Sequence, residues 1–153
     1  MALACALDEW RAQVGVGRAL DADAAQAKYG SDTSGAVRRI AGALLVDDRG
    51  QVPGLVRIAA RYKIPLYPIS TGHNWGYGGA LPVRDDCVIL DLSELTAILH
   101  FDPEFGVVTV EPGVTQAKLS AYLDTHGYPF LVPVTGTGSN CSLLGNALNE
   151  ATA

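Results

Sequence analysis

A strand–helix–strand pattern within residues 41–69 constrains the fold of this chain more than any other feature. The apolar run AGALLV, residues 41–46, is typical of a buried strand. Apolar residues then recur at helical spacing from Val52 to Tyr62, with Pro53 where a first helical turn would begin. PLYPI, residues 65–69, supplies the next strand. A strand–helix–strand unit of about thirty residues predicts parallel strands joined by a right-handed crossover.

The C-terminal half shows a different pattern. VILDL, residues 88–92, is a candidate strand, and residues 97–101 and 107–111 flank the turn DPEFG as in a hairpin. Thr115 can cap a helix that runs to His126, and Gly127 would end it. A small parallel unit followed by a mostly antiparallel sheet with flanking helices predicts the α+β class. We divide the chain into a helical lead-in, residues 1–30, and a main domain, residues 31–153.

Composition narrows the function classes. The chain has 153 residues, 48% of them hydrophobic, which is enough for one compact domain. Its net charge of −5 and the lack of a basic cluster argue against binding to nucleic acid or an anionic membrane surface, and no stretch has the length of a membrane span. The three cysteines form no CxxC pair, so we expect neither a zinc site nor a disulfide framework. The first residues do not resemble a secretory signal, and we expect a cytoplasmic protein.

Two long glycine-rich segments carry no Asp, Glu, Lys or Arg. The first is PISTGHNWGYGGALP, residues 68–82. The second spans residues 125–149, between Asp124 and Glu150, and contains the run PVTGTGSN. Glycine allows close backbone approach, and successive main-chain N–H groups form concave anion sites. Each segment alone could be a structural turn, but together they favour a ligand with a diphosphate. The patterns GxGxxG and GxxxxGK[ST] are absent, which excludes the dinucleotide fingerprint and the P-loop.

Four stretches of the sequence are the first glycine-rich segment and then VILDLSEL, VVTVEPGVTQAKLSAYL and GSNCSLLGNALNE. They occur in the order seen in the vanillyl-alcohol oxidase / p-cresol methylhydroxylase family, and residues 25–150 resemble that family. The resemblance implies a PCMH-type FAD-binding domain in which both segments hold FAD. EPGVT, residues 111–115, would start the helix behind them, with Pro112 and Gly113 structural. The positions that would bind the cofactor are Pro68, Ile69, Ser70, Thr71, Gly72, His73, Asn74, Gly76, Tyr77, Gly78, Thr135, Gly136, Gly138, Ser142, Gly145 and Asn146.

His73 has two candidate roles. In the berberine-bridge-enzyme branch, the histidine of an SGGH motif is bonded covalently to the flavin, and the present sequence reads STGH. Vanillyl-alcohol oxidase has an arginine at the matching position, so His73 could instead donate a hydrogen bond to a phosphate. The residues around His73 resemble those of vanillyl-alcohol oxidase and therefore favour the hydrogen bond. Cys141 resembles the cysteine that some relatives link to flavin, but the alignment on LGN places that link nearer Gly138.

The resemblance implies a flavin-dependent oxidoreductase that oxidises an alcohol or a 4-substituted phenol. Compared with the family, the chain lacks the later flavin-binding strands and the substrate domain, so no catalytic residue is assigned. The alternative is a non-catalytic module that binds FAD or associates with itself. The expected partners are a small-molecule substrate and either a second copy of the chain or the missing C-terminal half.

Overall fold

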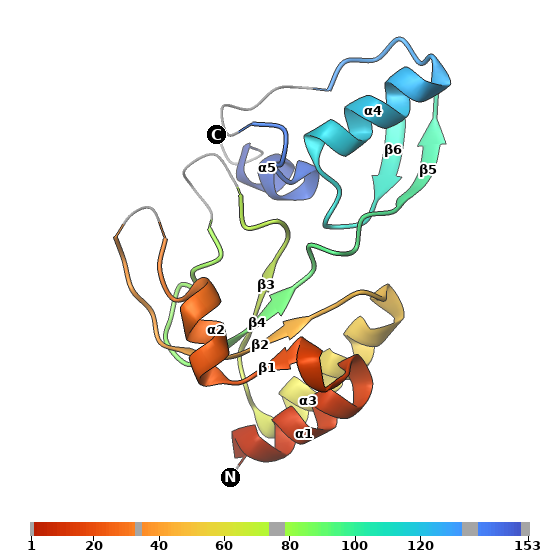
Figure 1. Cartoon of the computed structure of the whole chain (residues 1–153). Coiled ribbons are helices and arrows are strands. Elements are labelled where there is room, and N and C mark those ends of the chain that lie inside the picture. The colour runs from red at the N-terminus through yellow and green to blue at the C-terminus, as the bar shows by residue number, and fades with distance from the viewer. Residues whose placement is uncertain (1, 33–34, 74–78, 133–137, 151–153) are drawn as a thin grey trace.

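A four-stranded sheet with helices on both faces forms the N-terminal unit (Figure 1). The computed structural model describes residues 2–32, 35–73, 79–132 and 138–150. The strands lie in the order β1-β2-β4-β3, with bounds Ala19–Leu20 for β1, Ile40–Leu45 for β2, Cys87–Asp91 for β4 and Leu66–Ile69 for β3. Strands β2, β4 and β3 are parallel, and β1 runs antiparallel to β2.

Three helices pack on this sheet because strand side chains alternate between its faces. They are α1, α2 and α3, with bounds Ala2–Val14, Ala22–Tyr29 and Val52–Tyr62, and short 3₁₀ turns occur at Val16–Arg18 and Arg49–Gln51. Leu44, Val88 and Leu90 join the core formed with α1 and α3, whereas Ala43 and Ile89 join a second core with α2. The predicted helices near residues 3–15 and 52–62 are confirmed.

The order of the strands differs from the simplest expectation. The sequence pattern places VILDL with the C-terminal strands, but β4 lies between β2 and β3 and pairs in parallel with both. All five residues of β4 are buried, as expected of a strand with neighbours on both edges and helices on both faces. The predicted strand–helix–strand unit is therefore present, but its two strands, β2 and β3, are not neighbours, because β4 lies between them.

The C-terminal unit is a hairpin with two helices. Strands β5, Ile98–Asp102, and β6, Val107–Val110, are antiparallel. Helix α4 runs from Gln116 to His126; the Thr115 side chain accepts a hydrogen bond from the Lys118 N–H at 3.2 Å, and Gly127 ends the helix at φ +67°. The α+β class is confirmed. The segment rich in glycine and asparagine that was expected to be a loop contains helix α5, Leu143–Glu150. The helix forms there because the buried Ser142 side chain caps its start by accepting a hydrogen bond from the Gly145 N–H.

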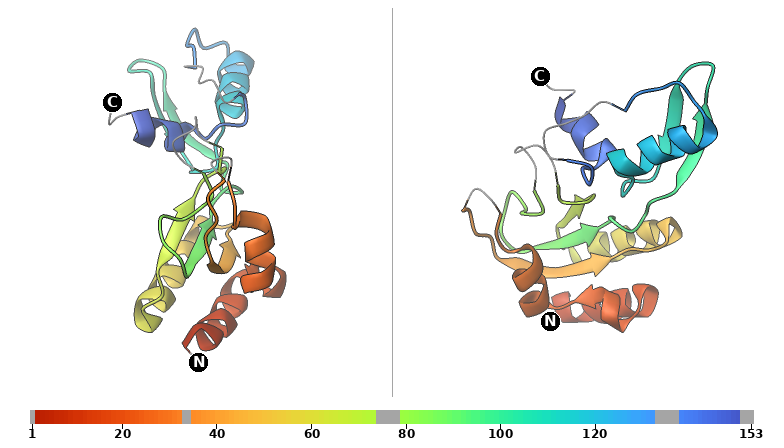
Figure 2. Two further views of the ribbon diagram at one scale, coloured as in Figure 1. Left: turned by 90° about the vertical axis from the view of Figure 1, so that its left-hand side faces the viewer. Right: turned by 45° about the horizontal axis from the view of Figure 1, so that its top comes forward.

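The carboxyl ends of the parallel strands point toward the C-terminal unit (Figures 1 and 2). Leu45 and Ile69 both pair with Asp91, so the three strands end at one level. Residues 1–30, expected as a lead-in, contribute β1 to the sheet and Trp10 to its core; the boundary at residue 30 stays a prediction. None of the helices described is long and apolar enough to cross a membrane.

Candidate functional site

The first glycine-rich segment begins at the carboxyl edge of the parallel sheet. Pro68 and Ile69 are the last residues of β3, and the Ile69 carbonyl accepts a hydrogen bond from the Leu92 N–H at 2.9 Å. Gly72 has a φ of +71°, and a Cβ on it would lie 3.5 Å from the Ala80 Cβ. The chain therefore leaves the sheet and turns back on itself at the edge where open α/β sheets bind ligands.

Neutral donors line the described part of this turn. Ser70 and Thr71 carry hydroxyls, and the Thr71 hydroxyl accepts a hydrogen bond from the His73 N–H at 3.3 Å. The His73 residue is exposed, so its ring is accessible to a ligand. Asn74, Gly76, Tyr77 and Gly78, predicted to bind the cofactor, lie outside the described residues.

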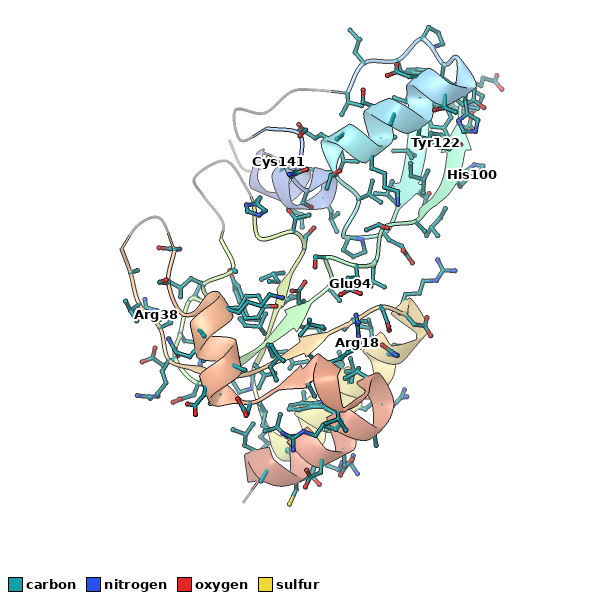
Figure 3. All side chains as sticks on the ribbon, in the orientation of Figure 1. Arg18, Arg38, Glu94, His100, Tyr122 and Cys141 are labelled. Carbon is teal, nitrogen blue, oxygen red and sulfur yellow. The ribbon has the colours of Figure 1, made fainter. Side chains whose placement is uncertain are left out.

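The second segment folds against the N-terminus of α4. The carbonyls of Ser139 and Cys141 accept hydrogen bonds from the N–H groups of Ala117 and Gln116, both at 3.0 Å. Gly138 precedes them at φ +92°, a left-handed conformation that favours glycine. Cys141 is fully buried and lies beside the start of α5 (Figure 3). Thr135 and Gly136, also predicted to bind the cofactor, lie outside the described residues.

Two serine hydroxyls join the two segments. The Ser70 and Ser142 Oγ atoms lie 2.6 Å apart, and both are within hydrogen-bonding reach of the Pro112 carbonyl, which lies 3.3 Å from the Ser142 Oγ. The Ser142 Oγ also accepts a hydrogen bond from the Gly145 N–H at 2.9 Å. We call Ser70, Pro112 and Ser142 the serine junction. The junction shows that segments 72 residues apart in the sequence meet at one place.

Gly113, which follows Pro112 of the serine junction, fixes the position of the Pro112 carbonyl. Gly113 donates a hydrogen bond from its N–H to the Leu95 carbonyl at 2.7 Å, and a Cβ on it would lie 2.2 Å from the Ser93 carbonyl oxygen. Contacts this close to backbone leave no room for a side chain. Gly113 therefore holds the turn before α4 against the segment that follows β4, which is a structural role.

A buried carboxylate lies at the carboxyl end of β4, beside the strand from which the first segment begins. Asp91, at the end of β4, accepts hydrogen bonds from the Tyr29 hydroxyl at 2.5 Å and from the Ser93 N–H at 3.0 Å, and Lys28 Nζ lies 3.4 Å from it. Burial alone would raise the pKa of Asp91, but the hydrogen bonds from Ser93 and Tyr29 and the charge of Lys28 lower it overall. Burial, and then the bond to Asp91, raise the pKa of Tyr29. At neutral pH the carboxylate is therefore ionised and the phenol is protonated.

An ion pair ties the connection between the two units to the sheet. Arg18 Nη2 donates to the Glu94 carboxylate at 2.6 Å, and Arg18 Nε donates to the Leu45 carbonyl at 3.1 Å (Figure 3). Glu94 lies between β4 and β5, so the pair links the carboxyl edge of the sheet to the chain that leaves it. Both side chains are partly exposed, and the contribution to stability is small.

The structure thus brings together Ser70 and Ser142 of the predicted set, with Gly145 bonded to Ser142 and Asn146 buried one turn into α5. The role of the Pro112 carbonyl and the cluster of Asp91, Tyr29 and Lys28 were not predicted. The sequence signal for the role of the Pro112 carbonyl is the run EPGVT. The residues of the cluster are up to 63 positions apart, so the cluster has no local sequence signal. Hydroxyls, main-chain N–H groups at glycine turns and an imidazole are donors suited to a diphosphate. The residues present therefore fit FAD.

Comparison with known proteins identifies the family. The family described as FAD binding domain matches residues 40–153. The 1'-carboxy-chondrochloren decarboxylase of Chondromyces crocatus is 36% identical over 141 residues, covering 92% of this chain and 26% of that protein. The 4-cresol dehydrogenase (hydroxylating) flavoprotein subunit of Pseudomonas putida is 38% identical over 100 residues, covering 65% of this chain and 19% of that protein.

A solved structure shows the same fold. The crystal structure of p-cresol methylhydroxylase with substrate bound superimposes with a TM-score of 0.86 and 31% identity, covering 96% of this chain and 29% of that chain. The chain therefore spans less than a third of the length of each of these three relatives. It belongs to the family described as FAD binding domain, with the fold seen in p-cresol methylhydroxylase.

Proposed function

We propose that the chain is the FAD-binding portion of an oxidoreductase that acts on an alcohol or a 4-substituted phenol. The observation that carries the proposal is the serine junction, which holds two uncharged glycine-rich segments together at the carboxyl edge of a parallel sheet. A relative whose name specifies 4-cresol supports the phenol class, whereas a relative named as a decarboxylase shows that the fold also serves other reactions. When bound, FAD would accept the equivalent of a hydride from the substrate.

The residues of this chain would bind and orient the cofactor. The Thr71 hydroxyl and main-chain N–H groups of both segments would hold the diphosphate, in the manner expected of neutral anion sites, and Ser70 would position the first segment through the serine junction. Of the predicted positions, Gly72 and Gly138 would serve through their left-handed conformations, and Asn146 through its place beside Ser142. Asn74, Gly76, Tyr77, Gly78, Thr135 and Gly136 belong to the same proposal.

The cofactor part is tested by titrating the purified chain with FAD and with riboflavin, and following flavin fluorescence. We expect saturable binding of FAD that is tighter than that of riboflavin, because riboflavin lacks the diphosphate. Equal affinity for the two flavins would contradict diphosphate recognition, and no binding of either would overturn the proposal.

The substrate part is tested with the FAD-loaded protein under anaerobic conditions. A 4-alkylphenol or an alcohol should bleach the absorbance of oxidised flavin. Release of carbon dioxide from a carboxylated phenol without lasting bleaching would place the reaction in another class. The same holoprotein tests His73: after denaturation we expect all flavin to be released, and a flavin adduct on a peptide containing His73 would show the covalent alternative.

Exposed apolar side chains favour self-association as a second candidate function. Leu144 and Leu148 lie one turn apart on α5 and are exposed, and Phe105 and Leu131 in the C-terminal unit are 74% and 98% exposed. A contiguous apolar patch marks a contact site, and Leu144 and Leu148 are neighbours on α5. Light scattering separates the two candidates: a monomer that binds FAD supports the first, and an oligomer that binds no FAD supports the second.

A further inference from the structure

Asp91 presents an electrostatic problem for a site that binds an anion. Its Cα pairs with that of Ile69 in the parallel ladder, and Ser70 of the serine junction follows directly. Neighbouring strands are about 4.8 Å apart, so Asp91 lies one strand away from Ile69, where the first segment leaves the sheet. For a diphosphate held beside that point, we take a separation of roughly 10 Å from the Asp91 carboxylate. Two anions at that distance repel each other unless a cation lies nearby.

The partners of Asp91 differ in charge. The Tyr29 hydroxyl and the Ser93 N–H are neutral donors that fix the carboxylate without cancelling its charge. Lys28 Nζ lies 3.4 Å from the same carboxylate oxygen as the Tyr29 hydroxyl, and 4.8 Å from the centre of the Tyr29 ring. Among the described residues, Lys28 is the cation within ion-pair distance of Asp91, whereas Arg18, which pairs with Glu94, interacts with Asp91 at longer range. Its side chain is 48% exposed, whereas that of Asp91 is 7% exposed, so the pair joins the buried carboxylate to solvent.

We propose that Lys28 is a positioning residue for the cofactor: it neutralises Asp91, and the carboxyl edge of the sheet then accepts the diphosphate of FAD. The inference rests on the proposed function, because it concerns the same site. Lys28 lies in the last turn of α2, outside both glycine-rich segments, and neither the sequence motifs nor the family match at residues 40–153 assigns it a role.

The proposal differs from two simpler roles of Lys28. A purely structural lysine would change stability without changing FAD affinity once the protein is folded. A lysine that contacts the phosphate directly would contribute to affinity whether or not Asp91 is charged. Compensation predicts instead that removal of the Asp91 charge restores the FAD affinity that is lost when the Lys28 charge is removed.

The expected magnitude follows from Coulomb's law. Two unit charges about 10 Å apart at an effective dielectric constant of about 20 change a binding constant roughly tenfold. Ionic screening has a length of about 10 Å at 0.1 M salt, so the effect should shrink as salt is raised. Lys28→Arg keeps the charge and should bind FAD as the wild type does.

The test is a set of FAD titrations at low and high salt on the wild type, Lys28→Gln, Lys28→Arg, Asp91→Asn and the Lys28→Gln/Asp91→Asn double variant. We expect Lys28→Gln to bind FAD roughly tenfold more weakly at low salt, with a smaller loss at high salt, and Asp91→Asn to bind FAD more tightly than the wild type. The double variant, whose pair again has no net charge, should match the wild type. Circular dichroism of the apoproteins confirms that each variant is folded.

Each contrary outcome has its own meaning. If Lys28→Gln binds FAD as tightly as the wild type, the inference is wrong while the proposed function stands. If the double variant binds FAD as weakly as Lys28→Gln does, the charge of Asp91 has no influence on binding and compensation is wrong. If Asp91→Asn does not fold, the comparison of Lys28→Gln with Lys28→Arg at two salt concentrations decides, since equal affinities overturn the inference. If the wild type binds no FAD, the proposed function fails first.

Discussion

Replacing Gly113 by alanine should destabilise the whole protein, and the structure allows the cost to be worked out. The new Cβ would lie 2.2 Å from the Ser93 carbonyl oxygen and 2.7 Å from that of Leu95. Contacts below 3.0 Å are essentially never seen for a real Cβ, so two backbone segments must separate by about 0.8 Å. Gly113 has no positive φ, and the cost is therefore steric rather than conformational.

Two contributions make up this cost. Overpacking of a well-packed site costs about 1–3 kcal/mol. Separation also weakens the hydrogen bond from the Gly113 N–H to the Leu95 carbonyl, and an unsatisfied buried group costs about 1–3 kcal/mol. We expect Gly113→Ala to lower the free energy of unfolding by about 2–6 kcal/mol, a large share of the roughly 5–15 kcal/mol that is typical of a native protein.

Urea denaturation followed by circular dichroism measures this loss. Gly17→Ala is the matched control, because a Cβ on Gly17 would meet nothing within 4 Å. FAD affinity of the folded Gly113→Ala protein should also fall, since Pro112 of the serine junction is the preceding residue. Stability of Gly113→Ala equal to that of Gly17→Ala would refute the reasoning.

Three further substitutions test separate parts of the account. Trp10→Phe removes the buried hydrogen bond from the indole N–H to a main-chain carbonyl and leaves a cavity, so urea denaturation should show a loss of about 2–4 kcal/mol. Tyr29 has a raised pKa in the folded state, so the stability that it provides is complete below about pH 10 and is lost as the pH rises further. The free energy of unfolding of the wild type should therefore fall more steeply above about pH 10 than that of Tyr29→Phe, and equal slopes would show that the bond to Asp91 does not favour the protonated phenol. Ser142→Ala should cost about 1–2 kcal/mol and weaken FAD binding, whereas Ser139→Ala, at an exposed position of the same segment, should change neither; equal effects would rule out the serine junction as the cause.

The sequence predicts those elements whose local signals agree. Pro53 and the apolar spacing from Val52 to Tyr62 define α3, and Thr115 and Gly127 bound α4. Helix α2 was missed because its alanine-rich sequence has little amphipathic pattern, although Asp21 offers a capping signal and its side chain accepts a hydrogen bond from the Ala24 N–H. Local periodicity identifies these elements only where their apolar faces are distinct.

Long-range relations could not be predicted from the same signals. Periodicity marks β4 as a strand but does not say that it lies between β2 and β3, because strand order depends on packing across the whole unit. The contact of Ser70 with Ser142 was anticipated only as two segments that flank one ligand; the shared Pro112 carbonyl was not. Helix α5 contains Gly145 and two asparagines, residues of low helix propensity, and it depends on the Ser142 cap.

The most direct test of the central claim is a structure of the protein determined with FAD. We predict that diphosphate oxygens lie within hydrogen-bonding distance of main-chain N–H groups from both glycine-rich segments, beside Ser70 and Ser142. A diphosphate bound elsewhere on the molecule, or held by lysine and arginine side chains without main-chain donors from either segment, would contradict the account.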